Sequence, residues 1–392
     1  MNTSPKTIVG GLCLTESGLE PAVLHIADGL MAGPNDLAIS DSDSTLDAGG
    51  LIVAPGFVDL QINGGFGIDL MTDPDGIWDL GRLLPATGVT SFLPTLVSSP
   101  PAVIEKFLTV LGERPADYVG AEPLGAHLEG PFINPAHAGA HGRDRIRELA
   151  ELSSAQIVGL ARLWARDGRV ALVTLAPELP GALDLIDELT DFGITVSLGH
   201  SSATVARASA AIDAGATMVT HLFNAMAGIG HRQPNLAGLA LTDSRITPTI
   251  ISDGHHVDPL MIRAAWNARP SRGLALVTDA VAAMGAPPGR HNFGARGVES
   301  DGRMVRTTAG VLAGSLLTMD QAISNLMTFT GCSVVDALHA ATSVPARLVN
   351  QPGRAGLCHG SHADIVLLEH GADGVRVRHT MVAGQVVSGE SQ

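Results

Sequence analysis

The chain has 392 residues, 45% of them hydrophobic, and a formal net charge of −15 at pH 7. Such a chain can bury a large core, so its composition excludes a disordered protein and predicts a large domain beside a smaller one. The negative charge argues against nucleic acid or an anionic membrane as a partner, and we expect neither.

Both ends of the chain have the pattern of short strands joined by turns. Residues 1–53 contain short apolar pieces separated by Gly, Asp and Ser, and the segment from Ala363 to Val387 looks alike. The middle of the chain has a different pattern. We therefore predict one small β-sandwich domain formed from both termini, residues 1–54 and 359–392.

From Pro55 onward, apolar runs that predict buried strands alternate with segments in which apolar residues recur every three or four positions, which predicts helices. The predicted strands are 57–62, 90–96, 123–128, 169–175, 194–199, 218–221, 247–252 and 274–278. The helices predicted in this way are 77–84, 102–111, 155–165, 183–192, 205–214 and 259–267. A capping-box pattern at Thr318-Met319-Asp320-Gln321 predicts a further helix over 321–330. This alternation predicts a (β/α)8 TIM-like barrel over residues 55–358, with its active site at the carboxyl ends of the strands.

Two long segments interrupt the alternation. Residues 134–146 contain His137, His141 and several glycines, and residues 284–314 are Gly-rich and include a pattern typical of a hairpin. Loops of this length inside a compact domain are more often functional than idle. We expect both to be functional.

Four of the predicted strands end on a polar residue that suits metal chemistry: Glu129, His200, His221 and Asp279. Alone, a carboxylate at a strand end is often part of a salt bridge, and a histidine there is usually a hydrogen-bonded core residue. Four matched strand ends favour a metal site instead. Two imidazoles and a carboxylate with one open position are typical of catalytic zinc, and Asp279 could move the proton of a water at the metal.

The lysine content limits the number of metal ions. The chain has only Lys6 and Lys106, and neither follows a predicted strand, so a binuclear centre bridged by a modified strand lysine cannot be built. We expect one divalent ion per subunit. Zn2+ is the expected ion, with Fe2+, Mn2+ or Co2+ as alternatives, because sites made of His and Glu accept each of them.

The chain also suggests where the protein resides. Its cysteines, Cys13, Cys332 and Cys358, are too few and too scattered for a disulfide framework. The first 20 residues lack the basic start and long apolar core of a signal peptide, and no apolar run reaches membrane-spanning length. We expect a soluble cytoplasmic protein.

With these motifs in view, the sequence closely resembles the N-acetylglucosamine-6-phosphate deacetylases of the amidohydrolase superfamily, over nearly its full length. The resemblance is carried by Pro55-Gly56-Phe57-Val58-Asp59, His127-Leu128-Glu129-Gly130-Pro131-Phe132, Leu198-Gly199-His200-Ser201, Thr220-His221-Leu222-Phe223-Asn224-Ala225-Met226, Asp253-Gly254-His255-His256-Val257-Asp258, Val277-Thr278-Asp279-Ala280 and Leu312-Ala313-Gly314-Ser315. Many superfamily members carry His-x-His on the first strand for another ion. Here that place reads Gln61-Ile62-Asn63, and amides are poor metal ligands beside imidazole, so the resemblance implies a mononuclear centre.

The resemblance also implies residue roles. Glu129, His200 and His221 would ligate the metal, Asp279 would be general base and then acid, and His141 would polarise the acetamide carbonyl. Without the resemblance, His141 would be taken for a loop histidine. His256 matches a contact to a sugar hydroxyl, and His255 beside it stands where an apolar residue is expected. The remaining implied substrate contacts are Ala140, Asn224, Ala225, Arg232, Asp253, Gly254, Leu312, Ala313 and Gly314.

The implied substrate is an amino-sugar phosphate. Backbone N–H groups at Asn224 and Ala225 and the guanidinium of Arg232 suit a phosphate. In the family this arginine reaches into the neighbouring subunit's site, which implies a homodimer, whereas a surface ion pair would be its ordinary role.

The implied reaction is hydrolysis of the acetamide of N-acetyl-D-glucosamine 6-phosphate. The nearest alternative is a deacetylase of another amino-sugar phosphate, such as N-acetylgalactosamine 6-phosphate. A non-catalytic metal-bound barrel would be expected to lack a ligand or Asp279, and the chain keeps all of them. An amidohydrolase of cyclic amides or phosphotriesters is disfavoured by Gln61, Asn63 and the shortage of lysine.

Overall fold

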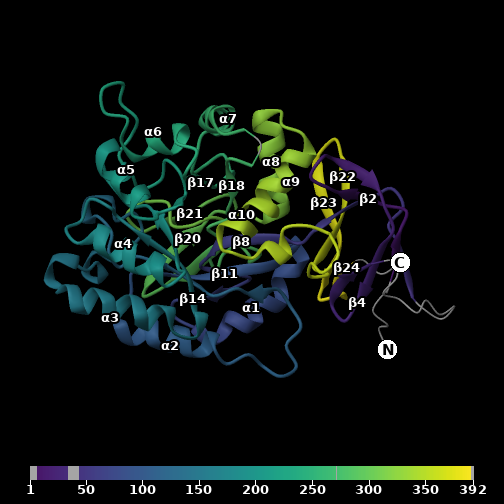
Figure 1. The fold of residues 1–392 in the computed structure, drawn as a ribbon, viewed down its shortest axis with the longest axis horizontal. Helices are drawn as coiled ribbons and strands as arrows, with labels where there is room; N and C mark the ends of the chain where they lie inside the picture. The colour runs from purple at the N-terminus through teal and green to yellow at the C-terminus, as the bar shows by residue number, and fades with distance from the viewer. Residues whose placement is uncertain (1–6, 34–43, 271, 390–392) are drawn as a thin grey trace.

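The computed structural model describes residues 7–33, 44–270 and 272–389, and it places a barrel of parallel strands beside a layer of β-sheets built from both ends of the chain (Figure 1). In Figure 1 the barrel and its helices fill the left and centre, and the purple and yellow strands of the two chain ends lie together at the right. Residues 1–6, 34–43 and 390–392 of the predicted terminal domain lie outside the described residues.

The barrel strands pair in parallel in the order in which they occur in the chain. They are β8 (Phe57–Ile62), β11 (Val89–Val97), β13 (Ala126–Glu129), β14 (Val170–Leu175), β15 (Thr195–Leu198), β16 (Met218–Val219), β17 (Thr247–Ile250) and β18 (Ala275–Leu276). A parallel bridge between Ile62 and Ala280 joins the last strand region to the first, which nearly closes the barrel. A short extra strand, β12 (Glu122–Pro123), pairs with β11. The predicted barrel is confirmed.

Helices cover the outside of the barrel. They are α1 (Ile77–Leu83), α2 (Pro101–Leu111), α3 (Ser154–Ala165), α4 (Ala182–Asp191), α5 (Val205–Asp213), α6 (Asn235–Thr242), α7 (Pro259–Ala268), α8 (Met319–Thr330), α9 (Val334–Ala341) and α10 (Ser343–Leu348). The periodicity predicted α1 to α5 and α7, and the capping-box pattern predicted α8, whereas α6, α9 and α10 were missed. In α9 every residue from Ala337 to Ala341 is buried, so this part of the helix has no exposed face to mark the helical period.

Two sheets from the chain ends lie beside the barrel and share apolar contacts. A four-stranded sheet contains β1 (Thr7–Val9), β4 (Leu24–Ala27), β5 (Leu30–Ala32) and β6 (Thr45–Asp47). A six-stranded sheet contains β2 (Leu12–Leu14), β3 (Leu19–Pro21), β7 (Ile52–Pro55), β22 (Ile365–Gly371), β23 (Gly374–Val382) and β24 (Gln385–Gly389). Ile8 and Ile26 of the first sheet share one apolar cluster with Val53 and Leu367 of the second. That these sheets form a separate domain with the predicted boundaries stays a prediction.

A buried ion pair connects the terminal layer to the barrel. Arg354 Nη1 contacts the carboxylate of Asp364 and donates to Ser91 Oγ of β11 at 3.1 Å, and Asp364 Oδ1 accepts from the backbone N–H of Ala383 at 2.8 Å. Only 10% of the Arg354 side chain and 5% of the Asp364 side chain are exposed. Because both side chains are largely shielded from water, each charge is stabilised mainly by the other.

Replacing Arg354 by Met is expected to lower the free energy of unfolding by about 3–5 kcal/mol, because it leaves the Asp364 carboxylate buried without its partner. Unfolding in urea would measure the loss. The control is Lys106→Met, which removes an exposed ion pair to Asp75 at 3.0 Å and should cost less than about 1 kcal/mol. Equal small losses in both variants would contradict the structural role of the buried pair.

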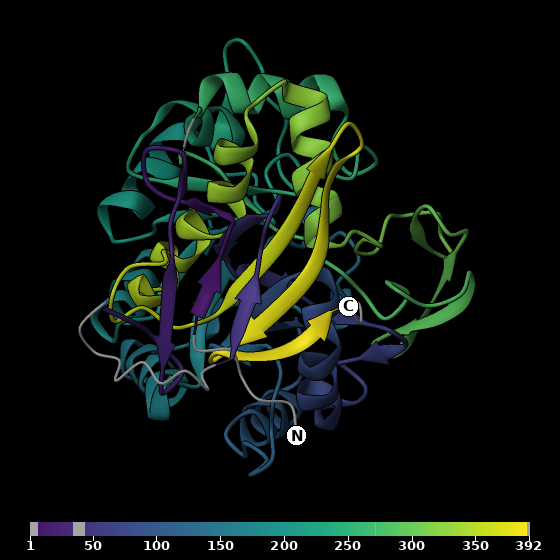
Figure 2. The ribbon, with the colours of Figure 1, turned by 90° about the vertical axis from the view of Figure 1, so that its right-hand side faces the viewer.

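The Gly-rich segment after the last barrel strand forms a three-stranded antiparallel sheet of β19 (Gly289–Phe293), β20 (Arg296–Ser300) and β21 (Val305–Thr307), which contains the predicted hairpin. In Figure 2 this green sheet extends from the right of the barrel. Phe293, Val298 and Val305 pack against Val97 and Val281, which follow or end barrel strands. The sheet is thereby fixed at the carboxyl end of the barrel. Two further short strands, β9 (Gly64–Gly65) and β10 (Ile68–Asp69), pair nearby.

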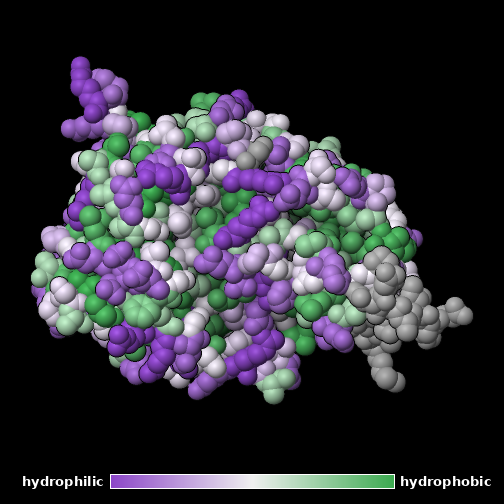
Figure 3. All heavy atoms as spheres, in the orientation of Figure 1, coloured by the Kyte–Doolittle hydropathy of each residue, from purple (hydrophilic) through white to green (hydrophobic). Residues whose placement is uncertain are grey.

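The surface in Figure 3 shows hydrophilic and hydrophobic residues interspersed over the face, as is usual for a folded protein. Among the described residues, no helix is long and apolar enough to cross a membrane.

Candidate metal centre

Four polar side chains meet where barrel strands end. Glu129 is the last residue of β13, and His200, His221 and Asp279 come shortly after β15, β16 and β18. The backbone is strained at three of them, with φ of 49° at His200, 31° at His221 and 49° at Asp279. Positive φ is uncommon outside glycine and collects at functional sites. His200, His221 and Asp279 thus have strained backbones at the carboxyl end of the barrel, where their side chains meet.

The Glu129 carboxylate is the centre of the group. Oε1 lies 3.0 Å from His200 Nε2 and 2.9 Å from His221 Nε2, and Oε2 lies 3.6 Å from His141 Nε2. All four side chains are buried, with at most 5% exposed. Burial alone would raise the pKa of Glu129, but the neighbouring imidazoles of His141, His200 and His221 outweigh it and hold the pKa well below its usual range. The carboxylate is therefore charged at neutral pH.

The donor set fits a divalent cation. His200 Nδ1 lies 2.7 Å from the carbonyl oxygen of His137, which can only accept, so Nδ1 carries the hydrogen. In the neutral ring the lone pair of His200 Nε2 then points at Glu129 Oε1, and two acceptors this close require a cation or a proton between them. A backbone carbonyl that orients a ligating imidazole in this way is typical of metal sites.

The distances between side chains permit two alternative sets of metal ligands. Ligand atoms of Glu129, His141 and His200 all lie within 4.8 Å of one another. His221 lies close to Glu129 as well, and its Nδ1 is buried without a partner among the described residues. Burial alone would lower the pKa of His221, but contact with Glu129 outweighs burial and raises it. The predicted set of Glu129, His200 and His221 differs from the first by one imidazole.

Asp279 is held by two amides. Asn63 Nδ2 donates to Asp279 Oδ1 at 2.7 Å, and Gln61 Nε2 donates to the same oxygen at 3.1 Å and to Glu129 Oε1 at 3.3 Å. Burial and the negative charge of Glu129 raise the pKa of Asp279 to about 6. Among the described residues, no hydrogen bond is recorded for Oδ2, which leaves that oxygen free to take a proton. Gln61 and Asn63 thus stand beside the site as hydrogen-bond donors.

A cavity of about 190 Å³ opens over this group. It is lined by the four polar residues and His141, by the predicted substrate residues Ala140, Asn224, Ala225, His256, Leu312 and Gly314, and by Asn63, Val97, Gly139, Ile251, Phe293 and Val311. The two long loops that were expected to be functional supply seven of these residues: Gly139, Ala140, His141, Phe293, Val311, Leu312 and Gly314. The volume of this cavity suits a small polar molecule of the size of a sugar.

The other predicted substrate residues do not line this cavity. Asp253 lies behind His256, where its Oδ2 is 2.6 Å from His256 Nδ1 and its Oδ1 accepts from the backbone N–H groups of His255 and His256. The His255 side chain is exposed, and Ala313 is buried in an apolar cluster. Arg232 is exposed on the loop before α6. Gly254 adopts φ 73° in the turn that carries His256.

The sequence did not predict two residues beside the site, one that contacts His141 and one in the wall of the cavity. Ser98, directly after β11, contacts the His141 ring, and Phe293 forms part of the cavity wall. Phe293 lies in the long loop that was expected to be functional, but the sequence did not mark its side chain. Ser98 had no signal, because a serine after a strand is ordinary.

A buried carboxyl supports the strand ends beneath the site. Asp59 of β8 accepts at Oδ1 from the backbone N–H groups of Gln61 and Thr278, both at 3.2 Å, and at Oδ2 from the Thr278 hydroxyl at 2.5 Å. Burial raises the pKa of Asp59 from 3.8 to about 7, against the opposing effect of these hydrogen bonds. Its protonation is therefore linked to folding.

The pKa of Asp59 is about 7 in the folded protein and 3.8 in the unfolded chain. Its contribution to the free energy of unfolding is therefore fully present below pH 3.8, where the group is protonated in both states, and it is lost as the pH rises through about 7. Between these values the wild-type free energy of unfolding should fall by up to about 1.4 kcal/mol per pH unit relative to Asp59→Asn. Urea unfolding of both proteins across this range would measure the difference in slope. Parallel slopes would contradict the linkage.

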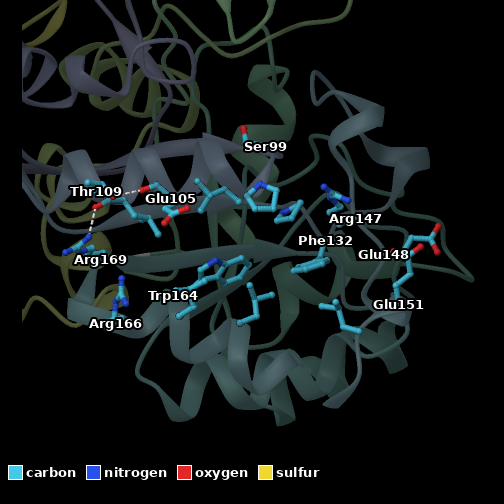
Figure 4. Close-up of a pocket in the computed structure, with 17 residues that line it drawn as sticks. Ser99, Glu105, Thr109, Phe132, Arg147, Glu148, Glu151, Trp164, Arg166 and Arg169 are labelled. Atoms are coloured by element: carbon cyan, nitrogen blue, oxygen red, sulfur yellow. Dashed lines mark hydrogen bonds between the residues drawn. The ribbon is translucent and has the colours of Figure 1, made fainter. Parts of the chain in front are cut away.

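A larger cavity, of about 500 Å³, lies outside the barrel between α2 and α3 (Figure 4). Its wall includes Phe132 and Trp164, and three glutamates and three arginines line it. No histidine lines it, and its charges balance. The metal chemistry therefore belongs to the smaller cavity at the strand ends.

The sequence profile of the amidohydrolase family matches residues 52–387, which include the whole barrel and every residue of the candidate centre. The chain belongs to the amidohydrolase family. The resemblance inferred from the sequence is confirmed, and as a member of this family the chain is a hydrolase.

Known amidohydrolases extend the comparison. The N-acetylglucosamine-6-phosphate deacetylase of Bos taurus is 41% identical, covering 98% of this chain and 94% of that protein. The N-acetylgalactosamine-6-phosphate deacetylase of Escherichia coli O157:H7 is 36% identical, covering 96% of this chain and 97% of that protein. A solved structure of a mutant N-acetyl-D-glucosamine-6-phosphate deacetylase from Mycobacterium smegmatis, in complex with N-acetyl-D-glucosamine-6-phosphate, superimposes with a TM-score of 0.85 at 32% identity, covering 98% of this chain and 99% of that one.

Proposed function

We propose that the chain hydrolyses the acetamide of N-acetyl-D-glucosamine 6-phosphate to D-glucosamine 6-phosphate and acetate. The observation that supports this most is the convergence of three imidazoles on Glu129 beside Asp279, at the floor of a cavity of sugar size. The Mycobacterium smegmatis relative, which covers nearly the whole chain, was solved with this sugar phosphate bound.

Glu129, His200 and His221 would hold one divalent ion, for which we propose Zn2+, with Fe2+, Mn2+ or Co2+ as alternatives. The bound ion would polarise the attacking water and the acetamide carbonyl as a Lewis acid. Gln61, through its hydrogen bonds to both Glu129 and Asp279, fixes the two carboxylates relative to one another.

Asp279 would move the proton. Its Oδ1 is occupied by the amides of Gln61 and Asn63, so Oδ2 takes a proton from water as the water oxygen bonds to the acetamide carbon. Oδ2 then returns the proton to the amide nitrogen while the C–N bond breaks. The products are the free amine and acetic acid, whose remaining proton passes to the amine or to solvent as acetate leaves, and Asp279 is again a carboxylate.

His141 would hold the carbonyl oxygen on which negative charge develops. Its ring lies 4.4 Å from that of His200, centroid to centroid, so an oxygen bound at the centre lies within its reach. Burial, with His200 nearby, lowers the pKa of His141 to about 4. The ring is neutral at pH 7 and acts as a hydrogen-bond donor.

Sugar and phosphate contacts follow from the cavity lining. We propose that Ala140, His256, Leu312 and Gly314 contact the sugar, with Asp253, Gly254, His255 and Ala313 shaping their segments. The backbone N–H of Asn224 donates to the carbonyl oxygen of His221 at 2.9 Å, so the backbone N–H of Ala225 would bind the phosphate, and Asn224 would line the same subsite. Arg232, which is exposed in the single chain, would complete that subsite in a partner subunit, so we propose a homodimer in the cytoplasm.

A second candidate function is deacetylation of N-acetylgalactosamine 6-phosphate, which is favoured by the 36% identity to the Escherichia coli O157:H7 enzyme named for that substrate. The two sugars differ in the direction of one hydroxyl. The Bos taurus enzyme named for the glucosamine substrate is 41% identical, and we rank that substrate first.

The test is release of acetate from three substrates: N-acetylglucosamine 6-phosphate, its galactosamine epimer and unphosphorylated N-acetylglucosamine. We expect the highest kcat/KM on the first and little release from the third. Preference for the epimer would select the second candidate. Equal rates on the phosphorylated and unphosphorylated sugars would contradict the proposed phosphate subsite. No acetate release from any of the three substrates would overturn the proposed activity.

A further inference from the structure

Ser98 and His141 form a buried pair behind the metal centre. Ser98 Oγ lies 2.9 Å from His141 Nδ1, and the backbone N–H of Ser98 donates to the same nitrogen at 3.3 Å. Ser98 is 4% exposed and His141 is 3% exposed. The ring is thus held on its Nδ1 side by one residue, and its Nε2 side points toward Glu129.

These contacts determine which ring nitrogen carries the hydrogen. A backbone N–H can only donate, so Nδ1 of His141 must present its lone pair. The hydrogen of the neutral ring is then on Nε2, which lies 3.6 Å from the Glu129 carboxylate, an acceptor. His200 has the opposite arrangement, because its Nδ1 donates to the carbonyl of His137 and its Nε2 lone pair is free.

We propose that Ser98 is a positioning residue that fixes His141 with its hydrogen on Nε2. This excludes His141 from the metal's ligands, although its distance to Glu129 and His200 would admit it, and leaves the third position to His221. The same arrangement aims an N–H donor at the acetamide oxygen, a step that rests on the proposed function.

The fold makes room for this contact. Ser98 directly follows β11, whose last residue, Val97, is in register with Glu129 on β13. Gly130, next to Glu129, adopts φ 84°, and a Cβ at this position would lie 2.4 Å from Ser98 Oγ. A side chain there would displace the hydroxyl that contacts His141. Glu129 and Ser98 are therefore placed by the same pair of strands.

The first measurement is long-range proton–nitrogen NMR of the zinc-loaded wild-type protein with 15N-labelled histidine, in which His141→Gln identifies the His141 signals. We expect a pyridine-like Nδ1 and a pyrrole-like Nε2 for His141. A hydrogen on Nδ1, or a shift of Nε2 on metal loading that marks it as a ligand, would overturn the proposal. Because this spectrum needs no substrate, it decides the proposal even if the wild-type protein releases no acetate.

The second measurement uses Ser98→Ala, with Ser98→Thr as the conservative variant and Ser99→Ala as the matched control. Ser98→Ala keeps the backbone N–H that sets the tautomer and removes the hydroxyl that holds the ring. If the wild type is active, this variant should lower kcat by about 10- to 100-fold with little change in KM or bound zinc, since such positioning contacts are usually of this size. Ser98→Thr should recover most of the loss, and Ser99→Ala should match the wild type. Unchanged kcat in Ser98→Ala, or equal losses in Ser98→Ala and Ser99→Ala, would contradict the role.

Discussion

Replacing Asp279 by Asn is expected to lower kcat by about 1,000-fold, within the range that general acid–base groups contribute, while zinc content stays at the wild-type level. The amides of Gln61 and Asn63 bond to Oδ1, and the reaction needs Oδ2 as a proton acceptor. An Asn side chain keeps the shape of the group but cannot take up the proton. Acetate release and elemental analysis of the same preparation would measure both quantities.

Two outcomes separate this role from a structural one. If Asp279→Asn loses zinc together with activity, Asp279 supports the metal and is not the proton carrier. If the variant keeps more than about a tenth of the wild-type kcat, another group moves the proton, because general base catalysis is worth at least about 100-fold.

Replacing Glu129 by Gln is expected to abolish zinc retention after dialysis and to lower acetate release by more than about 100-fold. Three imidazoles converge on this carboxylate, and its charge is what allows a divalent cation to bind among them. The amide is isosteric but neutral, and its nitrogen would face the imidazole nitrogens. Zinc content and thermal unfolding would be measured on each preparation.

The matched control is His137→Ala. Only the backbone carbonyl of His137 contacts His200, so removing its imidazole should leave zinc content and turnover near those of the wild type. Loss of zinc in His137→Ala as well as in Glu129→Gln would mean that the loop as a whole, and not the carboxylate, holds the ion. Full zinc retention in Glu129→Gln would remove Glu129 from the ligand set.

The barrel and the position of the candidate site at one end of it were predictable because two features of parallel strands can be recognised in the sequence. Buried strands such as β11 are apolar along their whole length, since helices and core cover both faces. Their carboxyl ends then share one rim, so polar residues after separate strands, such as Glu129 and His221, come together in space. This argument needs no contact information.

Contacts between loops could not be predicted in this way. The bond from Asp253 to His256 depends on a turn at Gly254, and the wall formed by Phe293 depends on how β19 to β21 pack on the barrel. Arg232 shows the same limit, because its exposed position is set by the loop and not by any period in the sequence. The tautomers of His141 and His200 need three-dimensional partners to assign.

The most direct test is a zinc titration of metal-free protein, with acetate release from N-acetylglucosamine 6-phosphate as the readout. The site geometry predicts activity that rises linearly with added zinc and reaches its plateau at one ion per chain. A plateau at two ions per chain would contradict a mononuclear centre with Gln61 and Asn63 as hydrogen-bond donors. Full activity without added metal, in protein shown to contain none, would contradict a metal-dependent deacetylase altogether.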